Sequence, residues 1–305
     1  MSTPTIESVR TPDARFEHLP GFDFAPHYLE GLPGFGSLRV HYLDERPLPA
    51  SGRTCLCLHG QPTWSYLFRK MIPVFTAAGH RVLAPDLFGF GRSDKPVAEE
   101  VYTFDFHRAM LMRFIEALDL TRVTLVVQDW GGLLGLTLPV EYPQRIDRLI
   151  VMNTGLGIGR SPGPGFDAWK AFVAGNPDFD IARMMKRSTP ILSDAEAAAY
   201  AAPFPDARYR AGARRFPALV PVSPDMQGVE VSQRAAKFFR EEWSGQTFMA
   251  IGMQDPVLGA PVMHALAKTI RGCPPPLELP DAGHFVQEWG GEVAQCALDS
   301  FDPPR

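Results

Sequence analysis

The sequence is poor in cysteine, and this scarcity excludes two kinds of site. Its four cysteines are Cys55, Cys57, Cys273 and Cys296. Cys55 and Cys57 lie two residues apart in an expected strand, so their side chains face the same way and are badly placed for a local disulfide. No group of cysteines and histidines has the spacing of a zinc site. We therefore expect a reduced, cytoplasmic protein that holds no metal.

Long apolar runs and an excess of one charge are also absent. The longest apolar stretches are strand-sized, well short of the ~18 residues that a membrane span needs. Residues 1–18 are polar and lack the apolar centre of a signal peptide. The net charge is −4 with both signs interspersed, which leaves no basic patch for nucleic acid. A chain of 305 residues, 45% hydrophobic, can bury one large core, or one core with an inserted lobe.

Strand-like and helix-like segments alternate through most of the chain. Apolar runs predict strands at 54–60, 81–85, 122–129, 148–153, 247–255 and 276–279. Periodic segments predict helices at 64–76, 103–118, 131–142, 261–270 and near the C-terminus. Two earlier runs, near 27–30 and 37–44, are expected to pair antiparallel. The alternation predicts a mostly parallel sheet with helices on both faces.

This alternation stops near residue 154 and resumes near residue 247. Residues 156–224 are rich in alanine, proline and arginine and predict helices only, one of which opens with a capping box from Ser193 to Glu196. A helical insertion between two strands of a parallel sheet is expected to form a cap over the strand ends. The chain is therefore divided into a first core part (1–155), a helical cap (156–224) and a second core part (225–305).

Polar residues that follow strands are the candidates for chemistry, because ligands of open parallel sheets bind beyond the carboxyl ends of the strands. Asp129 ends one strand and leads directly into Trp130-Gly131-Gly132. This pattern is typical of a nucleophile elbow, with aspartate in place of the usual serine. A carboxylate attacks carbon by displacement and becomes an ester that water must cleave. Alternatively, Asp129 only caps the helix that follows, which is a common role of aspartate.

Two further residues favour the catalytic interpretation of Asp129. Asp255 closes the strand at 247–255, and His284 lies in the loop before the last helix. The order nucleophile, acid, histidine is that of the α/β-hydrolases, which is therefore the expected fold. His284, oriented by Asp255, would take a proton from water and direct the water at the ester.

An oxyanion hole is expected from two backbone N–H groups, those of Gln61 and Trp130. The segment His59-Gly-Gln-Pro62 follows an early strand, where this fold supplies such a donor. The same four residues are also compatible with an ordinary turn that has no catalytic role. In either case His59 is expected to support the turn rather than to react.

Over nearly its whole length the sequence resembles the haloalkane dehalogenases. The resemblance rests on residues 59–64 (HGQPTW), 128–132 (QDWGG) and 281–287 (DAGHFVQ). It is strongest to the branch of the family in which the triad acid follows the later strand, as Asp255 does. One departure is Gln61, because this branch commonly has glutamate after His-Gly.

The resemblance implies a halide-binding pair of tryptophans and an apolar pocket wall. In this branch two indole N–H groups receive the departing halide, one beside the nucleophile and one in the cap, and these positions match Trp130 and Trp169. Phe166 falls where the family places an apolar wall. Indole N–H is a donor only, so two indoles can hold an anion without offering a competing base. Each tryptophan could equally be packed bulk.

The implied reaction is the hydrolysis of small haloalkanes to an alcohol, a halide ion and a proton through an alkyl ester of Asp129. It needs a haloalkane and water as partners and no cofactor, and the family resemblance implies a monomer. An epoxide hydrolase is the nearest alternative, because it combines the same triad with two cap tyrosines; Tyr200 and Tyr209 lie in contexts that favour packing or surface roles. A catalytically silent α/β-hydrolase scaffold is a second alternative, and it would have no need of all three triad residues.

Structural roles are expected for the remaining candidates. Tryptophans away from the motifs are expected to pack, namely Trp64, Trp243 and Trp289. The clustered arginines of the cap are expected to form a solvated face, namely Arg208, Arg210, Arg214 and Arg215. No arginine is expected beside Asp129 to bind a carboxylate.

Overall fold

The computed structural model describes residues 6–302. Its main sheet has eight strands in the order β10-β9-β8-β7-β4-β5-β3-β2. Along the chain these are β2 (His27–Leu29), β3 (Val40–Glu45), β4 (Thr54–Leu58), β5 (Arg81–Pro85), β7 (Val123–Gln128), β8 (Ile146–Met152), β9 (Gln246–Gly252) and β10 (Leu277–Leu279). β3 pairs antiparallel with both β2 and β5, and every pair from β5 to β10 is parallel. A short ribbon joins β1 (Ser8–Val9) to β6 (Lys95–Pro96).

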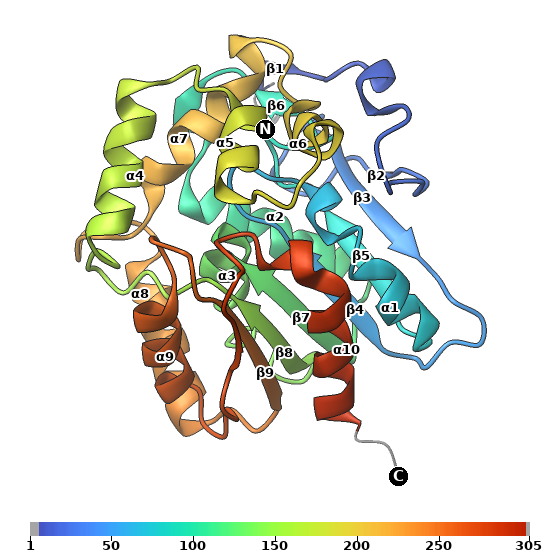
Figure 1. The fold of residues 1–305 in the computed structure, drawn as a ribbon, viewed down its shortest axis with the longest axis vertical. Coiled ribbons are helices and arrows are strands. Elements are labelled where there is room, and N and C mark those ends of the chain that lie inside the picture. The colour runs from blue at the N-terminus through green and yellow to red at the C-terminus, as the bar shows by residue number, and fades with distance from the viewer. Residues whose placement is uncertain (1–5, 303–305) are drawn as a thin grey trace.

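Helices cover both faces of this sheet, as Figure 1 shows. In that view α1 (Ile72–Ala77) and α10 (Gly290–Phe301) lie in front of the strands, and α2 (Phe104–Ala117) and α3 (Trp130–Gly135) lie behind them. α8 (Val229–Glu241) packs against α9 (Ala260–Thr269), which contacts β9. β4 and β7 are buried at every residue, which explains their unbroken apolar sequences. The predicted α/β-hydrolase fold is confirmed.

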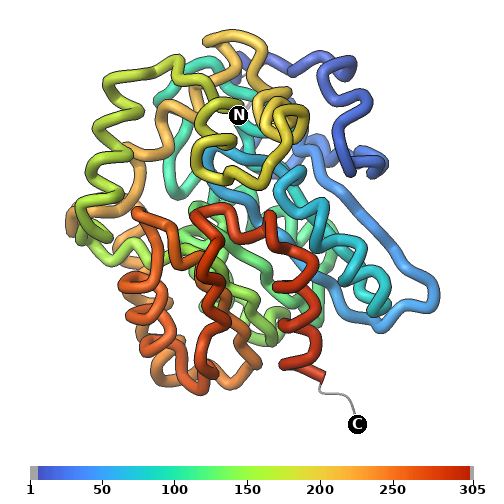
Figure 2. The backbone as a smooth tube through the Cα atoms, viewed as in Figure 1, coloured from blue at the N-terminus to red at the C-terminus, as the bar shows by residue number. Residues whose placement is uncertain are grey.

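Four of the five α-helices between β8 and β9 fall within residues 156–224, the predicted cap. They are α4 (Pro164–Gly175), α5 (Ile181–Ser188), α6 (Asp194–Ala201) and α7 (Ala211–Leu219). The tube view shows this part of the chain gathered above the strands as one block (Figure 2). Residues 156–224 contain no strand, and the capping box between Ser193 and Glu196 is present at the start of α6. The boundaries at 155 and 224 stay a prediction.

Two predicted helices are shorter than expected. The segment 64–76 divides into a 3₁₀ turn, η2 (Ser65–Phe68), and α1, because Pro73 lacks the N–H that a continuous helix would use and instead stands in the first turn of α1. The segment 131–142 is helical only as far as Gly135, and Pro139 prevents the helix from continuing. The other 3₁₀ turns are η1 (Asp13–Phe16), η3 (Glu99–Val101), η4 (Ala207–Arg210) and η5 (Val286–Trp289).

No helix within residues 6–302 is both long and apolar enough to cross a membrane. Within the same range no group of three or more His, Cys, Asp or Glu side chains could hold a metal ion. Cys55, Cys57, Cys273 and Cys296 are free thiols.

Candidate active site

Asp129 stands at a strained turn between β7 and α3. Its backbone has φ 50° and ψ −123°, a conformation that costs a non-glycine residue on the order of 1–3 kcal/mol. The turn is held by its N–H, which donates to the carbonyl of Asn153 (3.0 Å), and by its carbonyl, which accepts from Thr154 Oγ1 (2.7 Å). A Cβ at Gly131 would overlap the carbonyl of Leu58, so only glycine allows the helix to start this close to β4. The side chain makes no capping hydrogen bond to α3, which argues against a capping role.

The two carboxylate oxygens of Asp129 have different surroundings. Oδ1 accepts the backbone N–H of Gln61 at 2.8 Å, and Oδ2 lies 3.6 Å from Nε2 of His284. A Cβ at Gly60 would overlap the Asp129 carboxylate, so the turn after β4 needs glycine to approach it. The N–H of Trp130 donates to no acceptor within residues 6–302. The N–H of Gln61 thus contacts Oδ1, and the oxyanion hole of Gln61 and Trp130 stays a prediction.

Asp255 and His284 meet as a hydrogen-bonded pair beside Asp129. Nδ1 of His284 lies 2.7 Å from Oδ2 of Asp255, whose side chain is completely buried. Oδ2 also accepts from Asn153 Nδ2 (2.8 Å), and Oδ1 accepts the N–H of Val257 (2.8 Å). Burial alone would raise the pKa of Asp255, but His284 and these donors hold it below its usual value. Asp255 is thus an ionised anchor for the imidazole.

Two carboxylates determine the protonation of His284. Burial lowers the pKa of His284, whereas the charges and hydrogen bonds of Asp255 and Asp129 raise it, and the net result is a pKa of about 10. In the resting site the imidazole is therefore protonated at neutral pH. Its positive charge offsets one of the two negative charges of Asp129 and Asp255, between which it lies.

Gln128 is a further contact of His284 that the sequence analysis did not assign. Its amide nitrogen lies 2.9 Å from Nε2 of His284 and donates to the backbone carbonyl of His284 at 3.1 Å. Asn153, directly after β8, fixes Asp255; its side-chain amide also donates to the carbonyl of Gly252 and accepts the N–H of Gly252. Both residues position the triad, and both directly follow or end a strand beside a triad residue, which is the only signal in the sequence that could have pointed to them.

A cavity of about 1260 Å³ opens above the carboxyl ends of the strands. Asp129, His284, Trp130, Trp169 and Phe166 all line it. Neither the Trp130 nor the Trp169 indole N–H donates to an acceptor within the described range. By contrast, two other indoles are engaged inside the protein: Trp64 Nε1 donates to Ala199 O and Trp243 Nε1 to Thr247 Oγ1. The two cavity-lining indoles thus have unused donors at the site.

The remaining predicted pocket residues also reach the cavity. Phe166 is buried and forms part of the wall, and Trp169 packs edge-on against Phe179 with ring centroids 5.6 Å apart. The side chain of Gln61 points to the cap, where its amide donates to the carbonyl of Ala213 at 2.9 Å. A glutamate at this position, once ionised, would have no hydrogen to offer that carbonyl. The glutamine therefore suits this chain's own contact between core and cap.

Tyr200 and Tyr209 do not line the cavity. Tyr200 is completely buried, and its hydroxyl contacts Glu288 and Arg69. A packing role for Tyr200 therefore agrees with the structure. The paired cap tyrosines that an epoxide hydrolase would need are missing from the cavity lining.

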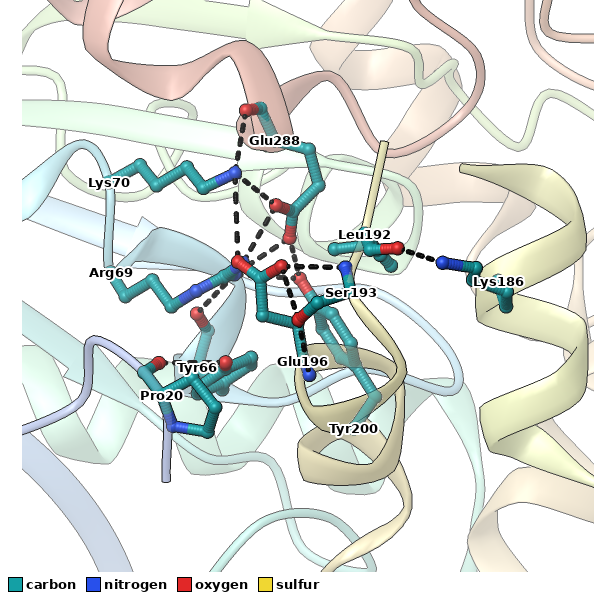
Figure 3. A network of polar contacts seen from close by, with 10 residues as sticks. All are labelled: Pro20, Tyr66, Arg69, Lys70, Lys186, Leu192, Ser193, Glu196, Tyr200 and Glu288. Atoms are coloured by element: carbon teal, nitrogen blue, oxygen red, sulfur yellow. Dashed lines mark hydrogen bonds and ion pairs between the residues drawn. The ribbon is translucent and has the colours of Figure 1, made fainter. Parts of the chain in front are cut away.

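Tyr200 belongs to an ion network that joins the cap to the core (Figure 3). Arg69, just after η2, binds Glu288 of η5 through two hydrogen bonds of 2.7 and 2.8 Å, and also binds Glu196 of α6 at 2.8 Å. Lys70 Nζ lies 2.8 Å from Glu288 Oε2. Glu288 is only four residues after His284, so the network fixes the histidine loop and α6 to the same buried arginine.

The expected solvated arginine face of the cap is wrong for three of its four members. Only Arg208 is exposed; Arg210, Arg214 and Arg215 are half-buried. Arg214 binds Glu99 at 2.6 Å, and Arg210 donates to backbone carbonyls that include that of Asp178 (3.1 Å). Arg214 thus attaches the cap to η3 of the core, whereas the acceptors of Arg210 lie within the cap itself. An arginine suits such half-buried positions because its stem buries apolar area while its head finds acceptors.

His59 has the structural role expected for it. It is completely buried; Nδ1 contacts the carbonyl of Gly60 at 2.9 Å, and Nε2 accepts the N–H of Leu87 at 3.0 Å. Burial lowers its pKa. A neutral imidazole thus ties the turn that carries Gln61 to the loop after β5.

Comparisons with known proteins agree with this site. Residues 54–291 match a family model described as alpha/beta hydrolase fold. A haloalkane dehalogenase of Psychrobacter cryohalolentis is 44% identical over 98% of this chain and 100% of its own. Haloalkane dehalogenase 1 of Mycobacterium bovis is 47% identical, over 96% of this chain and 98% of its own. This chain belongs to the haloalkane dehalogenases. The predicted resemblance is confirmed.

A solved haloalkane dehalogenase structure extends the likeness to three dimensions. DpaA from Paraglaciecola agarilytica superposes with a TM-score of 0.95 at 49% identity, covering 98% of this chain and 100% of that one. The structure of DpaA is described as tetrameric. For the present dehalogenase the expected monomer stays a prediction.

Proposed function

We propose that this dehalogenase hydrolyses small haloalkanes to an alcohol, a halide ion and a proton, with Asp129 as nucleophile. The observation that carries the proposal is the pairing of Asp129 with His284 at 3.6 Å in a cavity that two unpaired indole N–H groups also line. The relatives that match over nearly the full chain are named for the same activity.

Displacement is the first step. Oδ1 of Asp129 is held by Gln61, so Oδ2 is the oxygen free to attack. Oδ2 forms a bond to the halogen-bearing carbon as the carbon–halogen bond breaks. The departing halide takes the electron pair and is received by the indole N–H groups of Trp130 and Trp169. An apolar cavity makes that charge costly unless fixed donors meet it.

Hydrolysis of the ester is the second step. Once Asp129 is alkylated it no longer carries charge, so one of the two carboxylates that raise the pKa of His284 is lost. The pKa of His284 therefore falls, so the imidazole gives its proton to solvent and can then act as a base towards water. The hydroxide adds to the ester carbonyl, whose oxygen Oδ1 already has a donor in Gln61. As the Cγ–Oδ2 bond breaks, the departing oxygen takes the remaining proton of the added hydroxide and leaves as the alcohol. Asp129 is again a carboxylate, and His284 keeps the proton that it took from water, which restores the resting site.

The experiment that tests the activity compares two products. Halide release from 1-bromobutane or 1,2-dichloroethane and diol formation from styrene oxide are measured with the same preparation. We expect halide release and no diol. Formation of diol without release of halide would favour an epoxide hydrolase. A silent scaffold would be favoured if no substrate were turned over and if ligand binding survived the substitution Asp129→Asn.

A further inference from the structure

The cavity is larger than a small haloalkane requires. Its volume of about 1260 Å³ exceeds the roughly 300–1,000 Å³ usual for small-molecule sites. Asp129 and Trp130 lie at the ends of the core strands, and the cavity continues past apolar side chains of the cap such as Phe166, Phe172 and Met184. A longer substrate can therefore place its halogen at Asp129 and extend its chain along the cap.

The cap side of this cavity carries three arginines. Residues 180, 183, 184, 187 and 188 of the α5 segment line it, and this spacing is one face of a helix. Arg183 and Arg187 stand one turn apart on that face. Arg160, from the loop before α4, lines the same cavity. All three side chains are exposed to solvent.

These three guanidinium groups have no acceptor within residues 6–302. No hydrogen bond or ion pair joins Arg160, Arg183 or Arg187 through its side chain to another group there. Two cap arginines that do not line the cavity differ: Arg208 is paired with Asp206 (3.5 Å) and Arg214 with Glu99 (2.6 Å). The guanidinium groups of Arg160, Arg183 and Arg187 are therefore available to a ligand in the cavity.

The acidic groups of the cavity are placed differently. Asp129 and Asp255 belong to the triad with His284. Outside the triad, Asp180 and Asp281 line the cavity, and Asp180 is occupied as the N-cap of α5, where it accepts the N–H of Arg183 at 3.0 Å. Of these two acids only Asp180 belongs to the cap, whereas Asp281 lies in the loop that carries His284. The cap side of the cavity is therefore net positive, while the other end holds the nucleophilic carboxylate.

We propose that the dehalogenase accepts long-chain haloalkanes that end in a carboxylate, with the anionic end bound by Arg183, Arg187 and Arg160. Arginine binds a carboxylate through two parallel hydrogen bonds, which adds orientation to charge attraction. The chain has to be long, because a carboxylate close to the halogen would be repelled by Asp129. The reaction stays balanced: the ω-haloalkanoate and water give an ω-hydroxyalkanoate, halide and a proton. This inference rests on the proposed dehalogenation.

The test compares substrates that differ only in their far end. ω-Bromoalkanoates of about 4 to 12 carbons, 1-bromoalkanes of equal length and ω-bromoalkyltrimethylammonium salts are assayed for bromide release at low ionic strength. We expect kcat/KM for the carboxylates to rise steeply above a threshold length and to exceed that of the matching cations about tenfold or more. Salt near 0.5 M should remove the preference, because it screens exposed charges.

A double substitution, Arg183→Gln with Arg187→Gln, identifies the groups responsible. We expect the ratio of kcat/KM for the carboxylate to that for the neutral bromoalkane to fall about tenfold. Arg208→Gln is the matched control, since Arg208 is a cap arginine that does not line the cavity, and it should leave the ratio unchanged. An unchanged ratio in the double variant overturns the inference. The ratio would also stay unchanged if the arginines bound only the departing halide, because the reactions of both substrates would then slow by the same factor. Failure of the proposed function is distinct, since then no bromide is released from 1-bromobutane either.

Discussion

The side-chain amide nitrogen of Gln128 lies 2.9 Å from Nε2 of His284. An amide N–H can donate to Nε2 only while that nitrogen is unprotonated, so the contact favours the neutral imidazole. Asp129 and Asp255 favour the charged form and raise its pKa to about 10. The protonation of His284 is thus a balance between an amide and two carboxylates, and alkylation of Asp129 removes one of the carboxylates.

Gln128→Glu should therefore shift the pH dependence of ester hydrolysis. The new carboxylate would attract a proton on Nε2 and raise the pKa of His284 in the alkyl-enzyme. Only the neutral imidazole acts as a base, so the rate of ester hydrolysis drops as the pH falls below the pKa of His284. In the variant this drop should begin at a higher pH. Single-turnover rates measured across pH give the shift. Gln254→Glu adds the same charge elsewhere in the cavity lining, and an equal shift in that control would contradict a specific role for Gln128.

His284→Gln should separate the two chemical steps. Displacement by Asp129 needs no base, whereas hydrolysis of the ester does, so the variant should release one equivalent of halide and then stop. The intact protein should gain the mass of one alkyl group, measured by mass spectrometry after incubation with 1-bromobutane. The double variant with Asp129→Asn is the control and should gain no mass. A single variant that stays unmodified after exposure would count against the ester intermediate.

Isotope labelling should show where the oxygen of the alcohol originates. Because Oδ2 attacks carbon and the Cγ–Oδ2 bond later breaks, the first alcohol formed carries an oxygen of Asp129. A single turnover in ¹⁸O-labelled water should give unlabelled alcohol and a label in the peptide that contains Asp129. If the labelled oxygen appears in the alcohol of the first turnover, water attacks the substrate directly and Asp129 is not the nucleophile.

Trp169→Phe should weaken halide binding, because the ring remains while its N–H donor is lost. We expect an increase of about tenfold in the halide dissociation constant, the effect of losing a hydrogen bond to a charged group worth about 1.5 kcal/mol. Halide-dependent quenching of tryptophan fluorescence gives the constant. Trp289→Phe is the matched control, since Trp289 does not line the cavity. An unchanged halide dissociation constant in the Trp169 variant would mean that Trp169 only packs against its neighbours.

Glu288→Gln should destabilise the protein more than any other single change in the ion network. Glu288 is fully buried and accepts two hydrogen bonds from the buried guanidinium of Arg69. Its loss leaves the buried Arg69 with only the partly exposed Glu196 as an acidic partner, and breaking a buried ion pair costs about 3–5 kcal/mol in unfolding free energy. Glu196→Gln removes a partly exposed partner of the same arginine and should cost less, about 1 kcal/mol. Urea unfolding measures both, and equal effects would contradict the importance of burial.

The sequence predicted the parts of the site that adjoin strand ends. Asp129, Asp255 and His284 were selected because each follows a strand or lies in a loop at the same edge of the sheet, and the structure brings their side chains together. Their catalytic roles stay predictions. The strands of the sheet could be predicted from apolar runs in the sequence, because strands such as β4 and β7 are buried at every residue.

Contacts between distant segments were beyond prediction. Gln128 and His284 are 156 residues apart, and Arg69 and Glu288 are 219 apart, so no local pattern links them. Arg214 was assigned to a solvated face because its neighbours are also arginines, whereas its partner Glu99 lies in a different part of the chain. The helix predicted at 131–142 is too long, because apolar periodicity continues past Pro139 although the helix itself does not.

Asn153 lies at the base of the cap, where the chain leaves the last strand before the insertion. Its amide donates to the carbonyl of Gly252 and accepts the N–H of Gly252, at 3.1 and 2.8 Å, and Gly252 ends the first strand after the insertion. The exit and the return of the chain are therefore clamped to each other independently of everything between them. Insertions or deletions within the cap can reshape the substrate pocket over evolutionary time without displacing Asp255, which the same asparagine holds.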